Sequence, residues 1–193
     1  MIINGKDIFQ ERFVNTLLDH AEWISKADQL MDVARSLERK IKEMWEDWRK
    51  YESNKQETLQ IDDRFLSTFF MLSSFAIENL LKAIFLKNNM LQIRKAVISS
   101  KKFPRVLKDH DLLILARKAK LADFAKKNEE YLRKLTRSAV WYGRYPVPIS
   151  YTDVNVVFTS DVDKTVFTLS SYSNTDIEEV ERLVKELRGF ASA

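Results

Sequence analysis

The sequence predicts a mainly α-helical domain that ends in a β-hairpin and a last helix. Its 193 residues are close to the usual size of one domain, so residues 1–193 are expected to share one core. Only three glycines and three prolines interrupt the chain, which leaves long stretches without helix breakers. Apolar residues recur every three or four positions over much of the first 140 residues, and this spacing is typical of amphipathic helices.

The first half of the chain contains two amphipathic stretches, residues 9–26 and 28–51. They are one bent helix or two helices, and the small residues Ser25 and Ala27 mark the expected joint. His20 falls on the apolar side of the first stretch and is interpreted as a core histidine. The apolar side of the second stretch is predicted to consist of Leu30, Val33, Ala34, Leu37, Ile41, Met44, Trp45 and Trp48.

Residues 62–88 predict the central helix of a bundle, because nearly every face of this segment is apolar. Asp62 and Asp63 suit a helix start, where a carboxylate meets the positive end of the helix dipole. Asn88 and Asn89 are expected to end the helix.

Two further helices are predicted at residues 110–122, after a capping Asp109, and at residues 129–142. Beyond Pro146 the pattern changes to two β-branched runs, residues 154–159 and 165–169, which predict a hairpin.

A last helix is expected from Thr175 to about Leu187. Thr175 and Glu178 have the spacing of a capping box, and Gly189 is expected to stop the helix.

The composition excludes several kinds of site. The chain has no cysteine, which excludes disulfides, thiolate nucleophiles and cysteine-ligated zinc. With only two histidines, we expect neither a metal site nor a cofactor. The first residues do not resemble a signal peptide, and the longest apolar run without charge, residues 65–77, is too short to span a bilayer. A cytoplasmic protein without membrane contact is therefore expected.

Glu78 and Lys82 form the first candidate site. They stand four residues apart, in the favourable order for an ion pair, on the most apolar helix. Charges on a buried helix must be paired or face a polar cleft, because an isolated buried charge is costly. The two interpretations are a structural ion pair and a cleft that contacts a ligand or partner.

His110 is the only good candidate for a general acid or base, because imidazole titrates near neutral pH; otherwise it is a capping or buried histidine. A basic run precedes His110 and is either a solvated loop or a patch that contacts phosphate. The whole chain has a modest net charge of +4, which permits contact with nucleic acid but does not demand it. The basic residues are Lys101, Lys102, Arg105 and Lys108. Farther along, Arg144 either hydrogen-bonds at a helix stop or forms a fork for a phosphate or carboxylate.

Three segments, in this order, resemble the HEPN family (higher eukaryotes and prokaryotes nucleotide-binding domains). They are Ala76-x-Glu78-x-x-x-Lys82-Ala83, then His110-Asp111-Leu112, then Arg144-Tyr145-Pro146. The resemblance covers roughly residues 9–146, with residues 150–190 as an elaboration on that core.

The resemblance implies an up-and-down helical bundle, frequently a homodimer, with a polar cleft at the dimer interface. The cleft residues that it implies are Glu78, Lys82, Asp111, Arg144 and Tyr145. Family members occur in prokaryotic toxin–antitoxin and other defence systems, often beside a nucleotidyltransferase-type partner.

Many members of that family are metal-independent endoribonucleases that use an arginine and a histidine with four to six residues between them. Arg105 and His110 have this spacing, although they lie after Pro104 rather than on a late helix. The resemblance implies that Arg105 stabilises phosphate charge and that His110 moves a proton during attack by the RNA 2′-hydroxyl. Two functions stay open: RNA or nucleotide binding with RNA cleavage, and a non-catalytic module for dimerisation or protein interaction.

Overall fold

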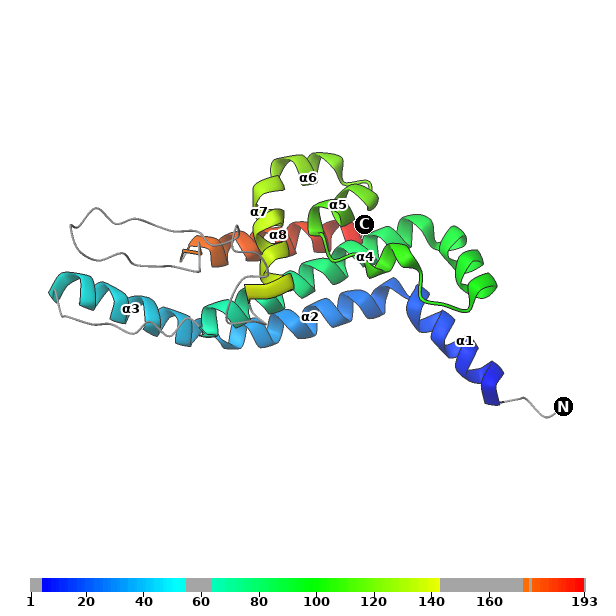
Figure 1. The fold of residues 1–193 in the computed structure, drawn as a ribbon, viewed down its shortest axis with the longest axis horizontal. Helices are drawn as coiled ribbons and strands as arrows, with labels where there is room; N and C mark the ends of the chain where they lie inside the picture. Colours follow the sequence, from blue (N-terminus) through cyan, green and yellow to red (C-terminus); the bar gives the residue numbers. More distant parts are fainter. Residues whose placement is uncertain (1–4, 55–63, 143–171, 174, 193) are drawn as a thin grey trace.

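The computed structural model describes residues 5–54, 64–142, 172–173 and 175–192, and the regular structure in these ranges is helical (Figure 1). The predicted mainly α-helical class is therefore confirmed. The expected hairpin at residues 154–169 and the expected helix start at Asp62 and Asp63 lie outside the described residues. The elements are α1 (Gly5–Leu18), α2 (His20–Ser36), α3 (Glu38–Asn54), α4 (Arg64–Ser100), the 3-10 helix η1 (Arg105–Lys108), α5 (Leu112–Lys118), α6 (Ala122–Lys127), α7 (Glu129–Arg137), the π-helical turn η2 (Ser138–Tyr142) and α8 (Thr175–Ser192).

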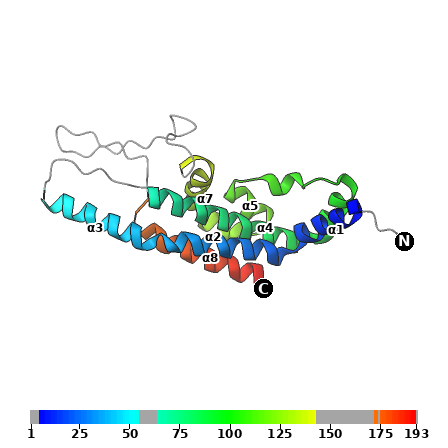
Figure 2. The same ribbon diagram turned by 90° about the horizontal axis from the view of Figure 1, so that it is seen from below.

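Helix α4 is the centre of the bundle, as its apolar sequence predicts. Helices α2 and α8 run along it, and α5, η2 and α7 pack on it as well (Figures 1 and 2). Its side chains Phe69, Phe70, Ile77, Leu80 and Leu81 are completely buried. Burial of this many large side chains makes the hydrophobic effect the main source of stability.

The predicted helix end at Asn88 and Asn89 coincides with a kink inside α4, beyond which a second helical segment continues to Ser100. Asn89 has non-helical angles (φ −132°, ψ 19°), and its side-chain amide donates to the Phe85 carbonyl over 2.8 Å. Such a side-chain bond competes with the helical backbone bonds. Helix resumes because Ile93 and Val97 are buried in a second apolar cluster, which also contains residues of α1.

The predicted joint between the first two helices at Ser25 and Ala27 is wrong, since both residues lie inside α2. The break lies at Asp19, which has an extended conformation (φ −76°, ψ 97°) and accepts a hydrogen bond from the Ala21 N–H over 3.0 Å. An aspartate in this position starts a new helix. Leu37 keeps nearly helical angles, so α2 and α3 are almost continuous.

These breaks change which side chains face the core. Met31 is 1% exposed although the predicted apolar side omitted it, whereas Val33 is 55% exposed. His20 is the first residue of α2 and is half-buried, so it is not a core histidine.

The helices predicted at residues 129–142 and from Thr175 are present, but they end differently from the prediction. The segment 129–142 is helical throughout, and its final turn widens into the π-helical η2. Helix α8 begins at Thr175 as predicted but runs through Gly189 to Ser192.

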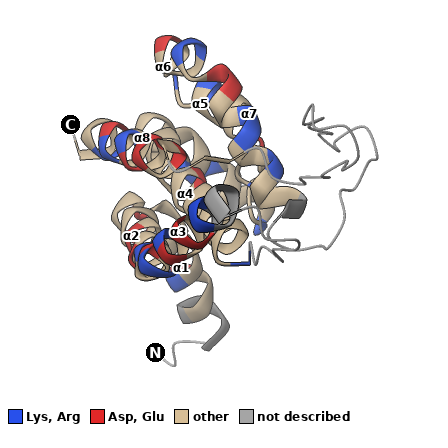
Figure 3. Cartoon of the chain, turned by 90° about the vertical axis from the view of Figure 1, so that its left-hand side faces the viewer, with Lys and Arg blue, Asp and Glu red and all other residues tan. Residues whose placement is uncertain are grey.

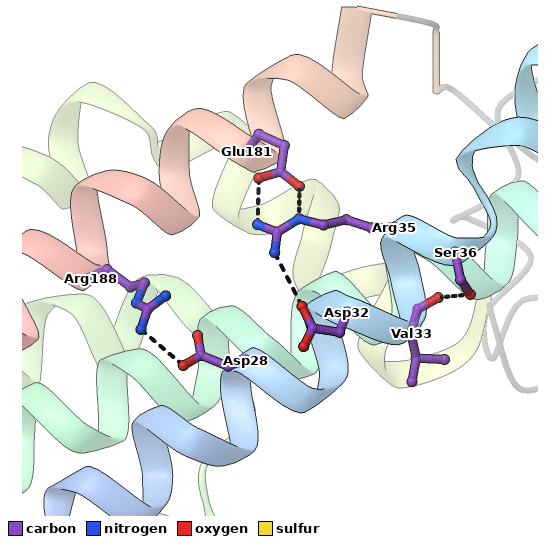
Figure 4. A network of polar contacts seen from close by, with 7 residues as sticks. All are labelled: Asp28, Asp32, Val33, Arg35, Ser36, Glu181 and Arg188. Atoms are coloured by element: carbon purple, nitrogen blue, oxygen red, sulfur yellow. Dashed lines mark hydrogen bonds and ion pairs between the residues drawn. The ribbon is translucent and has the colours of Figure 1, made fainter.

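Salt bridges join the outer surfaces of α2 and α8 (Figure 4). Arg35 donates two hydrogen bonds of 2.8 Å to the Glu181 carboxylate, and Arg188 lies 2.9 Å from Asp28. Positive and negative residues are mixed over these helices and α3 (Figure 3). Exposed pairs contribute little stability, so they specify how α8 sits on α2 more than they hold the bundle together.

Among the described residues, α4 is the one helix long and apolar enough to cross a membrane by length and composition. Within its most apolar window, 72% of the residues are buried inside the bundle. Buried core helices of soluble proteins share this composition.

A buried ion pair holds the start of α8 against α7. Lys134 lies 3.0 Å from the Asp176 carboxylate, which also accepts a hydrogen bond from the Ser173 N–H. In a capping box, an acidic side chain in the first turn accepts a hydrogen bond from the backbone N–H of the capping residue. Here Asp176 accepts that bond from Ser173, in place of the predicted Glu178. Burial would raise the pKa of Asp176, but the bonds from Ser173 and Lys134 outweigh it and lower that pKa.

Replacement of Asp176 with asparagine is expected to reduce the free energy of unfolding at pH 7 by about 1–3 kcal/mol, because Lys134 loses its partner. Since the pKa is lowered in the folded chain, the carboxylate stabilises the protein above its ordinary pKa of about 4 and stops doing so as the pH falls through the folded-state value. Urea unfolding from pH 7 to pH 3 should show the two proteins converging. Glu178→Gln, at an exposed position, is the matched control, and a pH-independent difference would contradict the prediction.

Candidate functional site

Glu78 and Lys82 form a buried ion pair on α4. The Lys82 Nζ lies 2.6 Å from the Glu78 Oε1, and the two side chains are 5% and 9% exposed. The ammonium group also lies 5.9 Å from the centre of the Trp23 ring, close enough for a cation–π contact. The pairing predicted from the sequence spacing is therefore present, and an aromatic ring of α2 covers it.

His110 approaches the same carboxylate from a different segment. Its Nδ1 lies 3.1 Å from both oxygens of Glu78. The imidazole is 61% exposed, and its Nε2 has no hydrogen-bond partner in the part of the chain that the structure describes. Glu78 thus joins a buried lysine to an accessible histidine.

The backbone around His110 is held by its neighbours. Asp111 caps α5 by accepting a hydrogen bond from the Ile114 N–H over 2.9 Å, and the Leu112 N–H donates to the Thr136 hydroxyl over 3.1 Å. The prediction that Asp109 caps this helix is wrong, because its carboxylate pairs with Lys118 instead.

The helix after His110 is shorter than the predicted segment 110–122. Lys120 has a positive φ of 65°, which ends α5 and separates it from α6. The Asp111 carboxylate accepts its hydrogen bond from the Ile114 N–H at the start of α5, and it does not contact Glu78 or Lys82.

The basic run lies between α4 and His110. Lys101 turns the chain out of α4 with a positive φ of 54°, and η1 follows. All four predicted basic side chains, Lys101, Lys102, Arg105 and Lys108, are exposed, and none forms an ion pair with a carboxylate of the described ranges. Arg105 makes no hydrogen bond with His110. Arg144 and Tyr145 lie outside the described residues.

Sequence reasoning missed two residues of this region, Trp23 and Thr136. Trp23 was missed because the break at Asp19 changes which side chains of α2 face the core. A tryptophan in the first turn after a capping aspartate is the sequence signal that could have revealed it. Thr136 looks like an ordinary polar position of α7, and only its contact with the backbone of α5 reveals its role.

What this cluster can do chemically follows from its parts. A histidine whose Nδ1 faces a carboxylate presents Nε2 as a proton acceptor or donor. Exposed lysine and arginine side chains nearby can contact phosphate groups. Within the described ranges, no group of three or more acidic, cysteine or histidine side chains is placed to hold a metal ion.

Comparison with known proteins provides no further guide. No protein-family model, curated protein or solved structure matches this chain.

Proposed function

We propose that this chain is a HEPN-like cytoplasmic protein of a prokaryotic defence or toxin–antitoxin system, which binds RNA and cleaves it without a metal ion. The contact between His110 and Glu78 carries this proposal. It joins two of the three motifs on which the family resemblance rests, although 32 residues separate Glu78 and His110 in the chain. A homodimer and a nucleotidyltransferase-type partner are further parts of this proposal.

In the proposed reaction, Glu78 accepts a hydrogen bond from the Nδ1–H of His110 and orients the ring, which leaves Nε2 free to take the proton of an RNA 2′-hydroxyl. The resulting oxygen attacks the adjacent phosphorus to form a 2′,3′-cyclic phosphate, and the bond from phosphorus to the 5′ oxygen breaks as that oxygen takes up a proton from solvent water. Lys82 balances the charge of Glu78, and the exposed basic run, including Arg105, contacts the phosphates. Arg144 and Tyr145, in the R-Y-P segment, are proposed to complete the cleft, and residues 154–169 to form a hairpin beyond it.

The test is cleavage of a labelled RNA in the presence of EDTA. His110→Ala should lower the rate by about 10²–10⁴-fold, the usual contribution of a general acid or base. His20→Ala is the matched control, because His20 is half-buried on α2 and makes no contact with Glu78. Absence of cleavage by the wild-type protein would overturn the enzymatic proposal, and equal cleavage by His110→Ala would exclude His110 as the base.

A second candidate function, a non-catalytic dimerisation or interaction module, is favoured by a different observation. Leu91 and Ile98 lie two turns apart on the second half of α4 and are 79% and 51% exposed. Large apolar side chains exposed along one face of a helix are common at protein interfaces. If Leu91→Asp dissociates a dimer in analytical ultracentrifugation and the wild-type protein does not bind RNA, this second function is supported.

A further inference from the structure

An open cavity of about 580 Å³ is lined by residues of α1 and α2, together with Asn79 of α4 and Phe103 from the chain after α4. Its lining is mainly apolar, and four of its ten lining residues are aromatic: Phe9, Phe13, Trp23 and Phe103. The volume lies within the range of small-molecule sites. The cavity is therefore large enough for a flat ring system.

The aromatic rings are placed on two walls of this cavity. Trp23 is held by a hydrogen bond from its Nε1 to the Leu17 carbonyl (3.0 Å), and its ring lies 6.4 Å from that of Phe103 at an angle of 44°. The two rings are tilted and do not stack on each other. On the other wall, Phe9 and Phe13 are 75% and 42% exposed. Such exposure of rings is unusual unless something covers them.

Cationic side chains line the cavity or lie next to a lining residue in the sequence. Arg12 and Lys26 belong to its lining, and Phe103 stands between Lys102 and Arg105 in the sequence. None of these four cations forms an ion pair with a described carboxylate. Unpaired cations around an aromatic cavity are complementary to a polyanion that carries flat apolar rings.

The remaining polar lining can contact a base edge. The Asn79 amide donates to the Phe75 carbonyl over 2.7 Å, which leaves its oxygen free to accept a hydrogen bond, and Glu22 supplies a carboxylate. Trp23 also connects the cavity to the proposed catalytic cluster, because its ring faces Lys82, the partner of Glu78.

We infer that this cavity is a binding site for one unpaired nucleobase of the bound RNA, separate from the cluster of Glu78, Lys82 and His110. The inference rests on the proposed function and adds a base-binding site to it. In a duplex, each base is stacked between its neighbours and cannot enter an aromatic cavity, whereas an unpaired base can stack on Trp23 and Phe103 while its phosphates contact Lys102 and Arg105.

The test measures the affinity of the full chain for a short fluorescent oligonucleotide by anisotropy. A 2′-O-methyl oligonucleotide is used because it lacks the attacking hydroxyl and cannot be cleaved. Phe103→Ala is expected to weaken binding of the single strand by about tenfold, the effect of losing one stacked base. Wild-type protein should bind the single strand at least tenfold more tightly than the same sequence in a duplex.

Two further variants keep the test independent of folding. Phe9→Ala changes the most exposed ring of the cavity and should also weaken binding. Phe190→Ala is the matched control: this ring is 39% exposed on α8, packs edge-on against Phe124 and does not line the cavity. Circular dichroism confirms that each variant is folded.

The outcomes separate this inference from the proposed function. If the wild-type protein binds neither form of RNA, both are overturned. If RNA binds but Phe103→Ala and Phe9→Ala bind as tightly as the control, or duplex and single strand bind equally, only the base-binding inference fails. If Phe9→Asp dissociates a dimer and leaves the RNA affinity unchanged, the cavity is a protein interface and the inference is overturned.

Discussion

Replacement of Phe70 with alanine is expected to lower the free energy of unfolding by about 3–5 kcal/mol, the usual cost of removing a phenylalanine from a core. Phe70 is completely buried near the start of α4, in edge contact with Phe69. Its ring also stacks on Tyr172 with 3.5 Å between ring centres and an angle of 8°. Truncation therefore leaves a cavity and removes the aromatic contact that holds Tyr172, three residues before the start of α8, on the central helix.

Thermal unfolding followed by circular dichroism measures this effect. For a chain of this length, the loss corresponds to a melting temperature lower by roughly 10 °C. Val33→Ala is the matched control, because the amphipathic pattern places Val33 in the core whereas the structure leaves it 55% exposed, and its effect should stay within about 0.5 kcal/mol. Equal effects of the two substitutions would contradict the position of α4 at the centre of the bundle.

Replacement of Lys82 with methionine is expected to cost about 3–5 kcal/mol, because it leaves Glu78 buried without its main partner. Methionine occupies a volume similar to that of lysine, so the loss reports on charge more than on packing. The exposed His110 is the only other partner of the carboxylate among the described side chains, and it is held less firmly than Lys82.

The double variant Glu78→Leu with Lys82→Met supplies the decisive comparison. Removal of both charges should restore most of the lost stability, since apolar replacements of a buried ion pair are often neutral or stabilising. Urea unfolding of the wild type, both single variants and the double variant completes the cycle. If Lys82→Met is as stable as the wild type, the pair is solvated and does not brace the helix.

The same double variant distinguishes a brace from a site. If the polar cluster serves only the fold, a stable double variant keeps whatever activity the wild type has. If Glu78 orients His110, the folded double variant loses RNA cleavage although its stability is normal.

The helical class, the central position of α4 and the pairing of Glu78 with Lys82 could be predicted because each depends on residues close in sequence. Hydrophobic periodicity reports which face of a helix is buried, and a spacing of four residues places two side chains side by side on one turn. The breaks at Asp19 and Asn89 are harder to interpret from sequence. Asp19 and Asn89 form side-chain bonds to the backbone, and propensity alone does not show whether such a bond ends a helix, starts one or bends it.

The sequence by itself determined the helices and one buried ion pair. Only the tertiary structure decided that His110 rests on Glu78, that Met31 is buried while Val33 is exposed, and that a second helical segment follows the kink at Asn89. These features depend on contacts between segments far apart in the chain. Burial against a neighbouring helix contributes more free energy than the local preference of any one residue, so the packing of α1, α2 and α5 on α4 selects among conformations that the sequence leaves nearly equal.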